Sequence, residues 1–185
     1  METIRCGWCE KDDLYRKYHD EEWGRPVYDD ETIFEFLILE SFQAGLSWYT
    51  ILSKRENFRK AFDHFDYKKI ADYSDRKIEE LMNNPGIIRN RLKILAAVTN
   101  AQRFMEVQQE FGSFSAYIWN FTGGKPIDNS PGTLADVPAT TDISDLISKE
   151  LKKRGFKFVG STVIYAHMQA TGMVNDHLKD CFIRK

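Results

Sequence analysis

Apolar residues recur at helical spacing along most of this 185-residue chain, whereas the alternation that is typical of strands is weak. A strongly apolar helix is predicted after Asp29 and Asp30, and Gly45 interrupts it. Ser47 can cap a second helix, which carries apolar positions as far as Phe62. The first part of the chain is therefore predicted to be helical.

Five more helices are predicted beyond residue 74. Ser74 and Ser113 stand where a helix N-cap is expected, and Gly155 and Gly172 stand where a helix ends. The Gly- and Pro-rich segment 122–138 is predicted to be a loop. The fold class is thus predicted to be all-α, in a single domain over residues 1–185, with the later helices at about 75–82, 87–107, 114–121, 143–151 and 161–171.

The composition is that of an ordinary globular domain, with 42% hydrophobic and 29% charged residues. Its length is enough to bury a substantial core. No apolar run approaches the roughly 18 residues that a membrane span needs, and the N-terminal segment lacks the basic-then-apolar pattern of a secretion signal. We therefore expect a cytoplasmic protein that does not associate with membranes.

The net charge of −2 argues against a protein that binds nucleic acid non-specifically through a strong basic excess. It does not exclude an enzyme that gathers its positive charge on one face. Three basic groups stand out, and each taken alone is better interpreted as a solvated helix face. Their members are Lys54, Arg55, Arg59 and Lys60; Arg89, Arg91 and Lys93; and Lys149, Lys152, Lys153, Arg154 and Lys157.

The Pro85–Gly86 junction between two predicted helices has the form of a helix-hairpin-helix unit, at about residues 75–107. In such a unit, backbone N–H groups of the turn and the following helix N-terminus can hold a DNA phosphate, and Arg89 could add a charge-assisted contact. The motif by itself favours an ordinary helix–helix corner, because Pro-Gly corners are common. Ile88 also stands where the usual hairpin pattern has a second glycine.

The chain has three cysteines, spread over both ends of the sequence, which does not indicate a disulfide framework. Four zinc-competent residues could instead form a closed structural site that ties the N-terminal segment to the C-terminus. They are Cys6, His19, His177 and Cys181, and a helical turn would place the last two on one face. Cys9 forms a C-x-x-C with Cys6 and could replace His19, and spacing does not decide between them.

Glu40 is the acid within a strongly apolar helical stretch, and the N-terminal part of the chain is rich in aromatic residues. A buried carboxylate is costly unless it is hydrogen-bonded or matched by positive charge. Glu40 therefore either pairs inside the protein or binds a cationic ligand that stacks on aromatic rings. The local sequence does not decide between these interpretations. The aromatic residues are Trp8, Tyr15, Tyr18, Trp23, Tyr28 and Trp48.

Several short motifs stand in order along the chain. They are Arg5-Cys6-Gly7-Trp8, Tyr18 to Gly24 (YHDEEWG), Leu39-Glu40, Gln43 to Trp48 (QAGLSW), Lys54 to Asn57 (KREN), Gly86 to Arg89 (GIIR), Leu151 to Gly160 (LKKRGFKFVG) and Val174 to His177 (VNDH). Together they resemble the 3-methyladenine DNA glycosylase I family, and the resemblance runs from Cys6 to Cys181. The order and spacing of so many motifs make the match specific.

The resemblance implies a helix-hairpin-helix glycosylase domain whose terminal segments, 6–19 and 177–181, hold a structural Zn²⁺. The implied ligands are Cys6, His19, His177 and Cys181, which favours His19 over Cys9. A monomer is expected, because glycosylases of this kind resemble monomers. The family also lacks the aspartate that many relatives place after the hairpin, and this chain has no clear acid in that region.

The implied activity is the excision of 3-methyladenine, with 3-methylguanine as a second candidate, from alkylated double-stranded DNA in base excision repair. The base would be flipped out and its N-glycosidic bond hydrolysed without a lyase step, releasing free 3-methyladenine. Glu40 matches the pocket carboxylate that hydrogen-bonds the extruded base. Trp8, Tyr15, Tyr18 and Trp48 match its aromatic surroundings, and the expected DNA contacts are Gly45, Leu46, Gly86 and Arg89.

The residues also allow two other functions to be considered. A catalytically silent module that recognises lesions would need the hairpin but not a complete base pocket. A zinc-stapled helical interaction domain would show no salt-dependent DNA binding. Leu46 likewise has two interpretations, an apolar wedge in the duplex or an ordinary core leucine.

Overall fold

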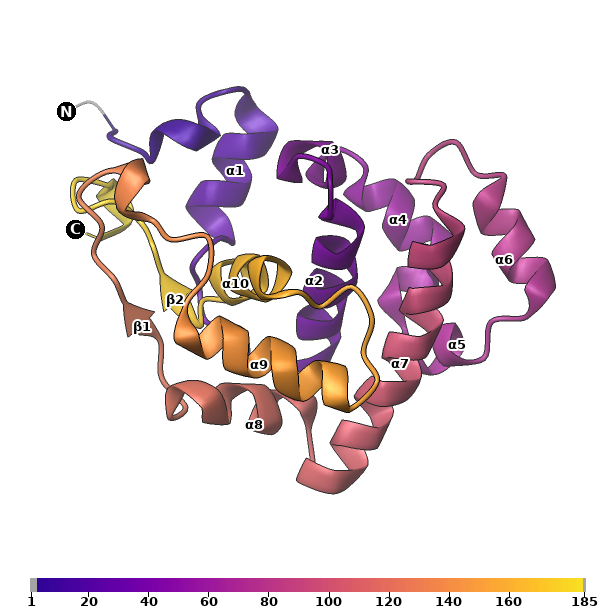
Figure 1. Cartoon of the computed structure of the whole chain (residues 1–185). Helices are drawn as coiled ribbons and strands as arrows, with labels where there is room; N and C mark the ends of the chain where they lie inside the picture. Colours follow the sequence, from indigo (N-terminus) through magenta and orange to yellow (C-terminus); the bar gives the residue numbers. More distant parts are fainter. Residues whose placement is uncertain (1–2, 185) are drawn as a thin grey trace.

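The computed structural model describes residues 3–184, and ten α-helices make up most of this part of the chain (Figure 1). Two short strands pair with each other in parallel. The helices are α1 (Asp13–Glu21), α2 (Asp30–Gln43), α3 (Trp48–Leu52), α4 (Arg55–Ala61), α5 (Tyr67–Ala71), α6 (Asp75–Met82), α7 (Arg91–Phe111), α8 (Phe114–Trp119), α9 (Asp142–Lys153) and α10 (Ser161–Ala170), and the strands are β1 (Ile127–Asp128) and β2 (Val174–Asn175).

Helix α2 is the centre of the core, and all of its residues from Phe36 to Phe42 are buried. A helix that is apolar on every side must be covered on every side, and α7 and α10 are among the helices that pack on α2. The ring of Phe42 lies 4.9 Å from that of Phe58 on α4. Because α2 is enclosed in this way, the side chain of Glu40 is carried into the interior.

Polar caps and left-handed glycines set several helix ends. Ser47, Ser74 and Ser113 each accept a hydrogen bond from a backbone N–H in the first turn of α3, α6 and α8, which confirms the predicted caps. Gly155 and Gly172, which follow α9 and α10, have φ of +90° and +68°. The predicted helix ends are therefore confirmed, with glycine in the conformation that side chains disfavour.

Other expectations differ from the structure. The predicted helix after Ser47 is two helices, α3 and α4. The long helix α7 begins at Arg91 rather than at Ile87, because the side chain of Asn90 caps it. The sequence pattern does not predict α1 or α5. It also does not predict β1, which lies in the expected loop and is only two residues long, too short for alternation to mark it.

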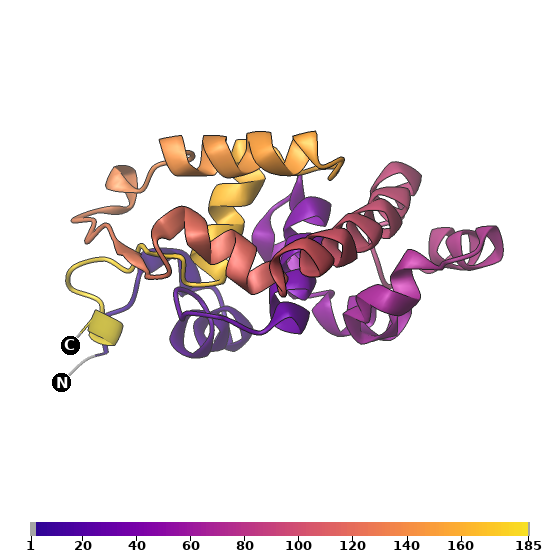
Figure 2. The same ribbon diagram turned by 90° about the horizontal axis from the view of Figure 1, so that it is seen from below.

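The described chain ends lie at one end of the molecule, and α6 lies at the other (Figures 1 and 2). Helices α6 and α7 pack against each other and are joined by residues 83–90. The class predicted from the sequence is confirmed in its main point, a mostly helical protein. None of the helices in residues 3–184 has the length and apolar character that crossing a membrane requires.

Candidate functional site

A cavity of about 310 Å³ lies between α1, α2, α3 and α10. Its lining includes the five residues that the sequence analysis groups as a pocket, Trp8, Tyr15, Tyr18, Glu40 and Trp48. The other lining residues are Trp23, Gln43, Leu134, Val137, Ala166, Gln169 and Asp176. Residues from the two ends of the chain are thus brought to one concave surface.

Glu40 carries the strongest local signal in this cavity. Its side chain is only 2% exposed, and Oε2 has no hydrogen-bond partner within residues 3–184. Burial raises the pKa of the Glu40 carboxyl well above its ordinary value, because the charged form has lost its water. Of the two interpretations of Glu40, internal pairing is therefore not what the structure contains. A group left in this state is typical of a ligand site.

Aromatic rings form much of the wall around this carboxyl group. The ring of Trp8 lies 4.9 Å from Tyr15 and 5.0 Å from Trp23, in edge-to-face contact, and the ring of Tyr18 lies 5.5 Å from Trp48. Burial raises the pKa of Tyr18 well above its ordinary value, so its hydroxyl keeps its proton. Trp48 Nε1 is buried without a hydrogen-bond partner within the described chain. The wall therefore offers both flat apolar faces and hydrogen-bond donors.

Another part of the wall contains a second buried carboxylate, Asp176, which the sequence analysis does not single out. Its oxygens accept hydrogen bonds from Tyr165 Oη at 2.7 Å, Gln169 Nε2 at 2.8 Å and Asn129 Nδ2 at 2.7 Å. Asp176 is thus satisfied inside the protein, in contrast to Glu40. The available signal is its place in the VNDH motif, next to a predicted metal ligand.

The turn after α2 borders the same cavity. Gly45 has φ of +81°, and the N–H of Leu46 donates to Gln43 O at 2.6 Å. Leu46 is 41% exposed, so the interpretation of Leu46 as a core leucine is wrong. A smaller cavity of about 170 Å³ lies between this turn and the start of α10, and its lining shares Glu40, Gln43 and Ala166 with the larger one.

In the segment between α6 and α7, the side chain of Asn84 closes the turn. The N–H of Gly86 donates to Asn84 Oδ1 at 2.8 Å, so it is already used inside the protein. Within residues 3–184, the N–H groups of Ile88 and Arg89 donate no hydrogen bond. The side chain of Arg89 is exposed and lies before α7, rather than inside it. Any anion bound at this turn would therefore meet residues 88 and 89 rather than Gly86.

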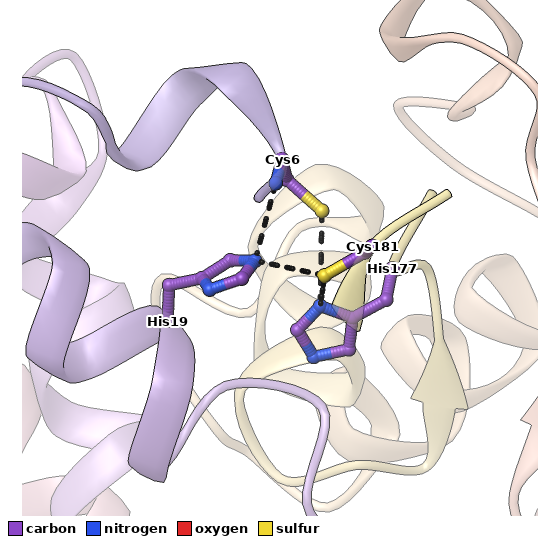
Figure 3. Close-up of side chains that lie close together, drawn as sticks. All are labelled: Cys6, His19, His177 and Cys181. Atoms are coloured by element: carbon purple, nitrogen blue, oxygen red, sulfur yellow. Dashed lines mark hydrogen bonds between the residues drawn. The ribbon is translucent and has the colours of Figure 1, made fainter. Parts of the chain in front are cut away.

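Four buried side chains from the two ends of the chain point toward one another (Figure 3). Cys6 Sγ lies 3.7 Å from His177 Nδ1, and Cys181 Sγ lies 3.6 Å from both His177 Nδ1 and His19 Nε2. In a tetrahedral site with metal–sulfur and metal–nitrogen distances of about 2.3 Å and 2.1 Å, sulfur and nitrogen ligands are about 3.6 Å apart. The group therefore has the spacing and donor set of a closed metal site.

The surroundings of this Cys/His cluster orient the two histidine rings. His19 Nδ1 lies 2.7 Å from Asp20 Oδ1, and His177 Nε2 lies 3.0 Å from the carbonyl oxygen of Trp23. Such outer partners fix the ring nitrogen that faces a metal. Cys9 lies outside the group, and its thiol donates to the carbonyl oxygen of Cys6 at 3.1 Å.

The approach of His177 and Cys181 has a different cause from the one predicted. Neither residue belongs to a helix. A turn in which the Cys181 N–H donates to the carbonyl oxygen of Leu178 at 2.9 Å brings the two side chains together instead. The predicted convergence is confirmed, and the predicted helical turn is wrong.

Comparisons with known proteins agree with one another. Residues 8–185 match the family model described as methyladenine glycosylase. The DNA-3-methyladenine glycosylase of Haemophilus influenzae is 48% identical over 179 residues, 97% of each chain. DNA-3-methyladenine glycosylase 1 of Escherichia coli is 47% identical over 177 residues, 96% of this chain and 95% of that protein.

Solved structures of similar proteins have the same fold. A crystal structure of 3-methyladenine DNA glycosylase I superimposes with a TM-score of 0.94 at 47% identity, covering 97% of this chain and 98% of the other. The Staphylococcus aureus enzyme, solved to explain its recognition of 3-methyladenine, also gives 0.94, at 39% identity over 98% of this chain and 96% of that one. A further structure of such an enzyme contains 3-methyladenine, with a TM-score of 0.94, 39% identity and coverage of 98% and 97%.

Proposed function

The chain belongs to the methyladenine glycosylase family, and from this premise we propose that it excises 3-methyladenine from alkylated double-stranded DNA, as a monomer that flips the damaged nucleotide into the Glu40 pocket. One observation carries the proposal. A carboxyl group without a partner in the described chain lies in a cavity lined by aromatic rings. A methylated purine supplies a positive charge for the carboxyl group and a flat face for the aromatic rings.

The damaged base is itself a good leaving group. Methylation at N3 gives adenine in DNA a formal positive charge and weakens its bond to the sugar. The C1′–N9 bond breaks, its electron pair neutralises the departing base, and water adds to C1′ and releases a proton to solvent. No strong acid is needed, so the enzyme has to extract the base, hold it and admit water.

Glu40 selects the base in this proposal. A cationic ligand lowers the pKa of a buried carboxyl group, so the two charges stabilise each other inside the cavity. Unmodified adenine is neutral and brings no such charge, and its bond to the sugar is strong. Stacking on rings such as Trp48 and Tyr18 contributes roughly 1–3 kcal/mol per base. That is comparable to the few kcal/mol that extrusion costs, which is least for a damaged base.

We also propose that the reaction stops at base removal. A lyase step needs an amine nucleophile that attacks the sugar. The described lining of the pocket contains no lysine, and Lys93 is turned to the carbonyl groups at the end of α2. The expected products are free 3-methyladenine and an uncut strand with an abasic site. Release of 3-methylguanine would extend the substrate range of the same pocket.

The DNA is expected to lie across the turn between α6 and α7, which we interpret as a helix-hairpin-helix. The N–H groups of Ile88 and Arg89, which donate no hydrogen bond within the described chain, suit a phosphate, with the Arg89 guanidinium as a second contact. Leu46 is exposed on a tight glycine turn beside the pocket, which suits a wedge that fills the space left by the flipped base.

The Cys/His cluster is expected to hold one structural Zn²⁺. Two thiolates and two imidazoles leave no open position in a tetrahedral site, so the metal supplies folding stability rather than a reactive water. The ligands would be Cys6, His19, His177 and Cys181. Because Tyr18 directly precedes His19 and Trp8 lies two residues after Cys6, the metal would also hold part of the pocket wall in position.

The test is release of methylated bases from alkylated duplex DNA, measured by chromatography, with gel analysis for strand cuts. We expect 3-methyladenine to be freed without cutting, and Glu40→Gln to lower the rate strongly. Glu31→Gln is the matched control, because Glu31 is exposed on the same helix. Near-normal release by Glu40→Gln would remove Glu40 from the mechanism. Intact DNA after incubation with folded, metal-loaded protein would favour a lesion-binding module, and absence of salt-dependent DNA binding would favour an interaction domain.

A further inference from the structure

Lys93 is a buried ammonium group that the proposed reaction does not use. Its side chain belongs to the first turn of α7 and is only 7% exposed. Nζ donates to the carbonyl oxygens of Phe42 at 2.8 Å and Ala44 at 2.6 Å, both at the end of α2. Within the described chain, the hydrogen bonds of this ammonium group therefore go to backbone carbonyl groups rather than to a carboxylate.

The position of Lys93 is unfavourable for α7 and favourable for α2. A cation in the first turn of a helix opposes the partial positive charge of that end, whereas a cation at a C-terminus is stabilised by the carbonyl groups there. The side chain leaves its own helix and reaches the end of α2, where backbone carbonyls lack helical partners. Burial lowers the pKa of Lys93, which shows that the site carries a solvation cost.

The two helices that Lys93 connects carry different parts of the proposed site. Helix α7 follows the turn of residues 83–90, while α2 carries Glu40 and leads into the Gly45–Leu46 turn. Figure 1 shows α2 and α7 in the middle of the molecule, and they are in contact. The carbonyl group of Ala44 immediately precedes Gly45, so a bond to it restricts the orientation of that turn.

We propose that Lys93 is a positioning residue that fixes the Gly45–Leu46 turn relative to the α6–α7 hairpin. Leu46 is then placed to enter the duplex that the hairpin holds. This inference rests on the proposed function and adds a role for a residue that does not touch the base. The proposed role of Lys93 distinguishes two steps, opening the duplex and holding the base. Fixing the turn matters for opening a duplex and much less for holding a base already free.

The test compares Lys93→Met, which keeps the aliphatic stem and removes the donors, with Lys93→Arg, which keeps charge and donors. For Lys93→Met we expect kcat/KM on alkylated duplex to fall roughly 10- to 100-fold, the loss typical of a misplacement of about 1 Å. Affinity for free 3-methyladenine, measured by tryptophan fluorescence, should change by less than about threefold. Lys93→Arg should recover part of the duplex activity. Lys69→Met, an exposed change on α5, is the control.

A second measurement reports on the Gly45–Leu46 turn in a complex from which no base has to be removed. A duplex with an abasic site and a neighbouring 2-aminopurine should brighten when the wild-type protein inserts Leu46 and unstacks the step. Lys93→Met should bind this duplex with a smaller brightening at saturation. Equal loss of base affinity and duplex activity, or wild-type behaviour in both assays, would overturn the positioning role. If the wild type freed no base, the proposed function would fail. The 2-aminopurine assay would still show whether Lys93 positions the Gly45–Leu46 turn.

Discussion

Glu40 and Trp48 lie on either side of the Gly45–Leu46 turn and line one cavity, and each carries a buried polar atom without a partner in the described chain. One is an acceptor when ionised, and the other is a donor only. Each such atom costs about 1–3 kcal/mol when it is left unsatisfied, and a ligand that pairs with it would recover that cost. The two atoms therefore suit the base that the proposed function assigns to this cavity.

Glu40→Gln is expected to stabilise the unliganded protein while it impairs base release. The folded-state pKa of Glu40 is raised, so the folded protein resists losing that proton and its stability falls as pH rises above the unfolded-state pKa of about 4.3. The amide does not ionise. The gain of Glu40→Gln should therefore be small at pH 4 and reach roughly 1 kcal/mol or more at pH 7, since each unit of pKa difference is worth about 1.4 kcal/mol.

Thermal unfolding of the wild type and Glu40→Gln across this pH range checks the prediction, with Glu31→Gln as the exposed control on α2. A gain that is the same at pH 4 and pH 7 would mean that Glu40 does not titrate as its burial requires.

Leu46→Ala is expected to separate activity from stability. Leu46 is exposed, so the free energy of unfolding should change by less than about 0.5 kcal/mol. Loss of the wedge should lower kcat/KM on duplex DNA by roughly 10-fold or more, since unstacking a step costs a few kcal/mol. Single-stranded alkylated DNA should be affected less. Leu146→Ala, at a similarly exposed leucine on α9, is the control, and an equal effect on both DNA forms would argue against a wedge.

The sequence allows much of this site to be predicted because its chemistry uses rare residue types. Glu40 stands out as an acid in an apolar helix, and the zinc-competent residues are few. Asp176 gives no comparable signal, because its pairing with Tyr165, Gln169 and Asn129 arises only when three separate segments meet. Lys93 resembles any surface lysine until the end of α2 packs beside it.

Some helix boundaries can likewise be predicted from the local sequence, and others depend on the folded core. Caps such as Ser74 act within one turn of the chain, so local sequence predicts them. The start of α7 depends on whether the apolar residues Ile87 and Ile88 continue the helix or pack in the connecting turn, and only the folded core decides that. Ile87 is buried in the connecting turn, although the periodicity assigns it to the helix.

His19→Ala is expected to lose the metal, and Cys9→Ala is expected to keep it. The His19 ring lies within the Cys/His cluster, whereas the thiol of Cys9 donates to a backbone carbonyl group. Metal analysis of the purified variants should give about one zinc per chain for the wild type and Cys9→Ala, and much less for His19→Ala. Loss of zinc only in Cys9→Ala would reverse the ligand assignment. Chelation should lower the unfolding temperature of the wild type and leave that of His19→Ala nearly unchanged.

Gly172→Ala is expected to destabilise the protein more than Gly123→Ala. Both glycines have φ of +68°, in the left-handed region that side chains disfavour. An added Cβ at Gly172 would meet the carbonyl carbon of Arg25 at 2.2 Å, whereas nothing lies within 4 Å at Gly123. We expect a cost of about 1 kcal/mol at Gly123 and roughly 3 kcal/mol or more at Gly172, from denaturant unfolding. Equal costs would show that the backbone around Arg25 yields.

The Cys/His cluster joins Cys6 to Cys181, so a metal ion bound there turns nearly the entire polypeptide into a ring. Fraying from either terminus would have to break metal–ligand bonds before it could spread inward. A single proteolytic cut in the long connection between α8 and α9 would open the ring without freeing either piece. The two pieces would still share one ion, and the segments around Cys6 and Cys181 would stay tethered to each other.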